Sequence, residues 1–110
     1  MKKFIFLPLL VLLCSFSMMA NAATITPAPT STVNGTADID ANNDITLSLN
    51  GAYITQIIYF SDVPYPRYWY ESVPNYGYYV FNSQHAHTLV VNYYDYTISQ
   101  YGVATYLITY

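Results

Sequence analysis

Apolar and polar residues alternate through residues 45–54, which read ITLSLNGAYI. Because successive side chains of a strand point to opposite faces, this pattern predicts two short strands that each have one apolar face. Asn50 and Gly51 separate the two runs, and Asn-Gly is typical of a two-residue type I′ turn, in which both residues have positive φ. We therefore predict an antiparallel hairpin. Its predicted pairs are Leu49 with Ala52, Leu47 with Ile54 and Ile45 with Gln56, and Ile58 and Phe60 continue the apolar face.

Four further segments are rich in the β-branched and aromatic residues that favour strands. They cover residues 36–40, 77–82, 87–95 and 102–109. Apolar residues do not recur at helical spacing over three turns in this part of the chain. Together with the two hairpin strands, these four segments make about six strands. This pattern predicts an all-β fold in a single domain at residues 35–110. A small antiparallel β-sandwich or a partly closed barrel fits that number of strands.

The first 22 residues have the features of a secretory signal peptide. Lys2 and Lys3 precede an apolar run, and residues 20–22 form an Ala-x-Ala cleavage site. The one cysteine, Cys14, lies inside this segment, so we expect a mature chain without thiols or disulfides. Lipidation of Cys14 is the alternative, which the bulky Leu13 before it disfavours. We expect the protein to be exported by a bacterial cell and to be periplasmic or secreted.

Residues 23–34 are rich in Thr, Ala and Pro and carry no charge. Proline removes backbone donors and favours extended chain, so we expect a short flexible arm between the signal peptide and the domain.

The net charge of the chain after residue 22 restricts the kinds of molecule that it can bind. All six acidic residues follow residue 22, whereas Arg67 is the one Lys or Arg there. This negative balance excludes a nucleic-acid partner, since phosphates would be repelled. The mature chain also lacks an apolar run of about 18 residues, so we expect no transmembrane segment.

Aromatic residues crowd residues 65–79, between prolines that stiffen the chain. Tyr and Trp offer a large, rigid contact area with a polar tip, as in the paratopes of binding proteins. If residues 68–70 form a strand, Trp69 faces the core as an anchor and its two neighbours face solvent. The predicted ligand-binding residues are Tyr65, Arg67, Tyr68, Tyr70 and Tyr76. The alternative is that these rings cover the core from a long connection.

Two segments are candidates for metal binding. Every second residue from 38 to 44 carries a side-chain oxygen, as in the first half of an EF-hand loop, but Asn43 and Leu49 replace the required Gly and Glu. These residues are Asp38, Asp40, Asn42 and Asp44. A tight hairpin between residues 36–40 and 44–49 is the favoured interpretation. His85 and His87 would share one face of a strand, but a site needs further ligands, and turn residues are the simpler interpretation.

The chain contains no nucleophile elbow, phosphate loop or paired-carboxylate motif, so we expect neither an enzyme nor a cofactor. We interpret it as a small exported binding domain that recognises a glycan or a protein surface through its Tyr- and Trp-rich patch. Residues 72–110 hold one formal charge, Asp95, which favours a second hypothesis of a structural subunit that assembles by strand addition into a surface fibre or matrix. A small metal-binding protein is the third hypothesis.

Overall fold

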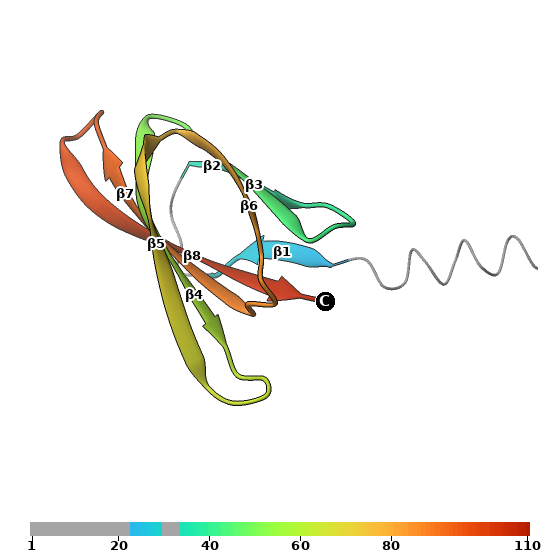
Figure 1. Ribbon diagram of the computed structural model, residues 1–110. Coiled ribbons are helices and arrows are strands. Elements are labelled where there is room, and N and C mark those ends of the chain that lie inside the picture. Colours follow the sequence, from blue (N-terminus) through green and yellow to red (C-terminus); the bar gives the residue numbers. More distant parts are fainter. Residues whose placement is uncertain (1–22, 30–33) are drawn as a thin grey trace, which may run out of the picture.

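The computed structural model describes residues 23–29 and 34–110, which form eight strands in two antiparallel sheets (Figure 1). The five-stranded sheet has the order β1-β8-β7-β4-β5, and the three-stranded sheet has the order β2-β3-β6. The strands are β1 (Thr24–Pro27), β2 (Gly35–Ile39), β3 (Asp44–Leu49), β4 (Ala52–Ser61), β5 (Arg67–Tyr76), β6 (Tyr78–Asn82), β7 (Thr88–Asp95) and β8 (Gln100–Thr109). The all-β prediction is confirmed, with more strands than the sequence indicated.

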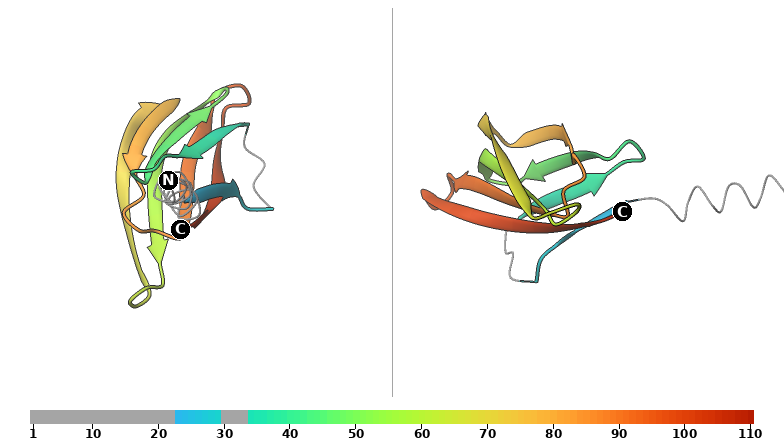
Figure 2. Two further views of the ribbon diagram at one scale, coloured as in Figure 1. Left: turned by 90° about the vertical axis from the view of Figure 1, so that its right-hand side faces the viewer. Right: turned by 60° about the horizontal axis from the view of Figure 1, so that its bottom comes forward.

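Both sheets contribute to one apolar core, which lies between them (Figure 2). Alternate residues of every long strand point into it, as the period of two requires. Its members include Ile45 and Leu47 of β3, Ile54, Ile57 and Tyr59 of β4, Leu89 and Val91 of β7, and Tyr106 and Ile108 of β8. Each such aliphatic side chain contributes about 1.5–3 kcal/mol through burial, and this packing holds the domain together.

The predicted hairpin at Asn50 and Gly51 is wrong. Strand β3 pairs with β2 and β6, whereas β4 pairs with β5 and β7, so the turn carries the chain from one sheet to the other. Gly51 has a φ of 77°, but Asn50 is not among the residues with positive φ, so the turn is not type I′. The apolar face itself is confirmed, because the alternate residues from Ile45 to Ile54 are buried. Alternation identifies the buried side chains, and two facing sheets satisfy it as well as a hairpin does.

A bulge in β4 corrects the second half of the predicted apolar face. The register shifts between Ile54 and Gln56, which inserts one residue and reverses the direction of every later side chain. Ile57 and Tyr59 therefore face the core in place of Ile58 and Phe60.

Two strands lie outside the six strand segments that the sequence predicted. Strand β1 lies within the expected arm and pairs with β8, with Ile25 opposite Ile108. Residues 30–33 of the expected arm and the expected signal peptide at residues 1–22 lie outside the described residues. Strand β5 includes most of the aromatic segment, and Gly77 alone connects it to β6 in the other sheet.

Candidate functional site

Strand β5 sends its aromatic residues to two sides of the five-stranded sheet. Trp69 is half-buried and stacks on Tyr59, with ring centroids 5.4 Å apart and planes 3° from parallel. Tyr68 and Tyr70 point the other way and are 71% and 65% exposed. The orientations predicted for these three residues are confirmed, although Trp69 is not fully buried.

The surface of the five-stranded sheet that faces away from the core, hereafter the outer face, carries no charged side chain among the described residues. Paired residues on neighbouring strands point to the same side, so the register identifies the members of this face. Its four rows are Tyr68-Phe60-Thr88-Leu107, Tyr70-Ile58-Val90-Thr105, Ser72-Gln56-Asn92-Val103 and Tyr53-Tyr94-Tyr101. Aromatic rings stand at both ends of the face, and Tyr101 is 80% exposed.

The three charged residues in the strands of this sheet all sit on the opposite side. Arg67 pairs with Ser61, and Glu71 pairs with Ile57, and both partners are buried on the core side. Asp95 likewise pairs with the buried Ala52. The charged residues of this sheet therefore all lie on its core side, where a buried charge costs free energy unless it is paired or hydrogen-bonded.

Glu71 is held by two phenols between the sheets. The Tyr59 hydroxyl donates a hydrogen bond to Oε1, and the Tyr79 hydroxyl donates to Oε2 over 3.1 Å. Burial, followed by the hydrogen bond and the charge of this carboxylate, raises the pKa of Tyr59 and also that of Tyr79. Both phenols therefore keep their protons, and the carboxylate is satisfied from two sides.

The structure does not bring the five predicted ligand-binding residues onto one surface. Tyr65 is exposed in the β4–β5 loop, while Tyr68 and Tyr70 lie on the outer face. Arg67 lies on the core side, with its Cζ 4.8 Å from the Trp69 ring centroid. Tyr76 pairs with the inward-facing Ile54, and its ring lies 6.0 Å from that of Tyr79. Alternation along β5 puts Arg67 on the side opposite to Tyr68 and Tyr70. Tyr76 is even-numbered as well, but the register shift between Ile54 and Gln56 places it opposite an inward-facing residue.

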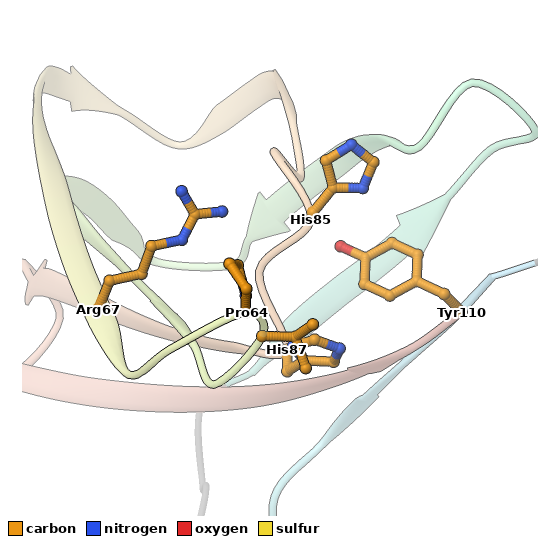
Figure 3. A pocket seen from close by; sticks show the side chains of 6 residues that line it. Pro64, Arg67, His85, His87 and Tyr110 are labelled. Carbon is orange, nitrogen blue, oxygen red and sulfur yellow. The ribbon is translucent and has the colours of Figure 1, made fainter.

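Arg67 instead borders a pocket at one end of the two sheets (Figure 3). The pocket has a volume of about 410 Å³ and is lined by Val63, Pro64, Arg67, His85, His87 and Tyr110. Sequence reasoning missed this combination, because Tyr110 and the β4–β5 loop reach it from distant parts of the chain. The available signal was that Arg67 and both histidines are the scarce basic side chains of the domain.

The acidic segment forms the tight hairpin that the favoured interpretation predicted. Strand β2 pairs with β3, and Asn43 has a φ of 62°. Asp40 Oδ1 accepts hydrogen bonds from the backbone N–H groups of Asn42 and Asp44, each over 2.9 Å. Within residues 23–29 and 34–110 no three His, Cys, Asp or Glu side chains gather in a group that could hold a metal ion.

His85 and His87 lie in the connection between β6 and β7, where turn residues were expected. The Nδ1 atom of His87 lies 3.5 Å from Ser61 Oγ, which is long for a hydrogen bond. Ser61 is buried, and its hydroxyl donates to the carbonyl oxygen of Val63 over 3.2 Å. This pair is therefore not arranged as a nucleophile with its base.

The chain matches no known protein family, no curated protein sequence and no solved structure. The described residues include no helix that is long and apolar enough to cross a membrane.

Proposed function

We propose that this chain is a small exported, non-catalytic β-sandwich whose outer face binds the uncharged surface of a polysaccharide. The observation that carries the proposal is the separation of charge across the five-stranded sheet. Its charged residues lie on the core side, while exposed rings such as Tyr68, Tyr70 and Tyr101 occupy the side that meets solvent.

The chemistry of the outer face suits sugars better than other partners. Flat rings offer apolar area to the C–H faces of pyranose units, and their hydroxyls can bond to sugar hydroxyls. Amide and hydroxyl side chains lie between the aromatic ends, and Asn92 Nδ2 donates to Gln56 Oε1 over 2.9 Å. A neutral ligand loses little solvation on such a face, whereas the acidic residues elsewhere would repel an anionic polymer.

Retention on insoluble neutral polysaccharides tests this function. Cellulose, chitin, starch and mannan form the panel, and we expect the domain to be retained on at least one. The double variant Tyr68→Ser/Tyr70→Ser should bind that polymer at least about 30-fold more weakly, as hot-spot rings do when removed. The matched control is Tyr78→Ser, which removes an exposed ring from the three-stranded sheet.

Equal retention of the double variant and the parent would contradict the proposal. A parent that is retained on no member of the panel would also contradict it, and would leave a protein surface as the partner class.

A second candidate function, assembly by strand addition, rests on a different observation. Among the described strands, β5 pairs only with β4 and β6 pairs only with β3, so each presents one unpaired edge. Unpaired edges are templates for further strands. Size-exclusion chromatography over a wide concentration range separates the candidates, since a monomer at every concentration contradicts strand addition.

A further inference from the structure

The pocket at the end of the sheets concentrates the basic side chains of an acidic domain. Arg67 is the one Lys or Arg that follows residue 22, and His85 and His87 are both histidines of the chain. They come from two separate segments, the start of β5 and the β6–β7 connection (Figure 3). No acidic side chain lines the pocket. The pocket is therefore an electropositive site in a domain of opposite charge.

The guanidinium of Arg67 lies over the face of the Trp69 ring, and it forms no ion pair with any of the described residues. Trp69 is fixed in turn, because its Nε1 donates to Gln84 Oε1 over 2.9 Å and its ring stacks on Tyr59. A guanidinium has five N–H donors in a planar fork, which matches the two oxygens of a carboxylate.

The remaining walls of the pocket are largely apolar, and hydrogen bonds hold the Tyr110 side chain among them. The Tyr110 hydroxyl lies 2.7 Å from the carbonyl oxygen of Ala86, to which it donates, and 2.8 Å from Ser83 Oγ. Both imidazoles pack against the Tyr110 ring, with centroids 6.2 Å away for His85 and 5.7 Å away for His87. Val63 and Pro64 complete the wall from the β4–β5 loop. A volume of about 410 Å³ admits a small organic molecule.

We propose that this pocket binds a carboxylate attached to a small apolar group, with the carboxylate on Arg67 and the apolar part against Val63, Pro64 and Tyr110. The imidazole N–H groups of the two histidines supply further donors. This site lies on the core side of β5 and is separate from the polysaccharide-binding outer face. The ligand is either a free carboxylic acid or the last residue of a peptide, which share this chemistry.

The test is a calorimetric titration of the whole domain with 3-phenylpropionate. Trp69 is the one tryptophan of the chain, so its fluorescence gives an independent readout next to Arg67. We expect saturable binding of 3-phenylpropionate, and binding at least about tenfold weaker for 3-phenylpropanamide, which keeps the shape and loses the charge. A short peptide that ends in Phe, with a free or an amidated carboxyl group, distinguishes a chain end from a free acid.

The variants locate the site. Arg67→Met keeps the length of the side chain and should weaken the binding of 3-phenylpropionate at least about tenfold. Arg67→Lys keeps the positive charge and should weaken this binding less. Tyr68→Ser is the matched control, because it changes the next residue on the opposite side of β5 and should leave this affinity unchanged. Circular dichroism of each variant checks its folding.

Equal binding of the acid and its amide, or equal affinity of Arg67→Met and the parent, would overturn the carboxylate site. The absence of binding by every carboxylate probe would overturn it too. The two proposals fail independently, since Tyr68→Ser/Tyr70→Ser affects retention on polysaccharide and Arg67→Met affects carboxylate binding.

Discussion

The outward surfaces of the two sheets differ, although both sheets bury the same kind of apolar residue. On the three-stranded sheet, Asp38 pairs with Thr46, and Asp44 accepts a hydrogen bond from Asn82 Nδ2 over 3.0 Å. These acidic side chains lie on the side away from the core, where water solvates them. On the five-stranded sheet the outward side carries rings, amides and hydroxyls without charge.

Packing of the core does not explain this difference, because the outward-facing residues of both sheets do not pack against the core. The charged residues of the five-stranded sheet lie instead on its core side. Glu71 accepts two phenolic hydrogen bonds there, Asp95 accepts one from the backbone N–H of Thr97, and Arg67 lies over the ring of Trp69. Exposed apolar patches on soluble proteins are typical of contact sites, and we therefore base the proposed binding function on the uncharged outer face.

The inward and outward sides should differ most in their effect on stability. Leu89→Ala removes a fully buried side chain and should lower the free energy of unfolding by about 2–5 kcal/mol. The matched control Leu107→Ala removes the same atoms from the outer face, where the side chain is 43% exposed, and should cost less than about 1 kcal/mol. Urea denaturation measures both, and equal losses would remove the distinction between the two sides.

The partners of Glu71 allow a second test of the inward side. Tyr59→Phe deletes the hydroxyl that donates to Oε1 and leaves a half-buried carboxylate with one phenol, at a cost of about 1–3 kcal/mol. Tyr68→Phe makes the same chemical change on the outer face and should alter stability by less than about 0.5 kcal/mol. Thermal denaturation of the two variants compares them, and an inert Tyr59→Phe would show that Glu71 does not depend on that bond.

Alkaline pH should weaken the folded state through the same phenols. Burial and the neighbouring Glu71 raise the pKa of Tyr59 and Tyr79, so these residues hold their protons more tightly when folded. Their stabilising contribution is complete below the unfolded pKa of about 10 and is lost as the pH rises above it, at no more than about 1.4 kcal/mol per pH unit for one group. Urea denaturation between pH 8 and 11 measures the slope, which should be shallower in Tyr59→Phe; equal slopes would exclude Tyr59 as the source.

Outer-face rings should matter little for folding. Tyr68→Ser/Tyr70→Ser should change the free energy of unfolding by about 1 kcal/mol or less, because both side chains remain largely in solvent. A loss like that of Leu89→Ala would mean that the rings are structural, and would weaken the case for a binding surface.

The sequence predicted which residues are buried better than which strands are neighbours. Alternation identified Leu47 and Ile54 as core residues, but two strands of one hairpin and two strands of facing sheets bury them alike. The bulge before Gln56 has no local signal, and it exchanges Phe60 for Tyr59 in the core. The local sequence therefore determines which side chains alternate between buried and exposed, whereas packing between distant segments determines which strands pair.

The same limit applies to the candidate site. Alternation predicted the opposite directions of Trp69 and Tyr70, since it depends on adjacent residues alone. The pocket depends on Arg67, His85 and Tyr110 meeting across the fold, which only the topology determines.

Backbone amide shifts in two-dimensional NMR test the central claim most directly, during titration with neutral hexasaccharides of glucose, N-acetylglucosamine and mannose. The account predicts that at least one of them shifts the amides of Tyr68, Tyr70 and Tyr101 on the outer face and leaves Asp38 and Thr46 of the three-stranded sheet unchanged. Shifts confined to the three-stranded sheet, or no shifts with any of the three sugars, would contradict it.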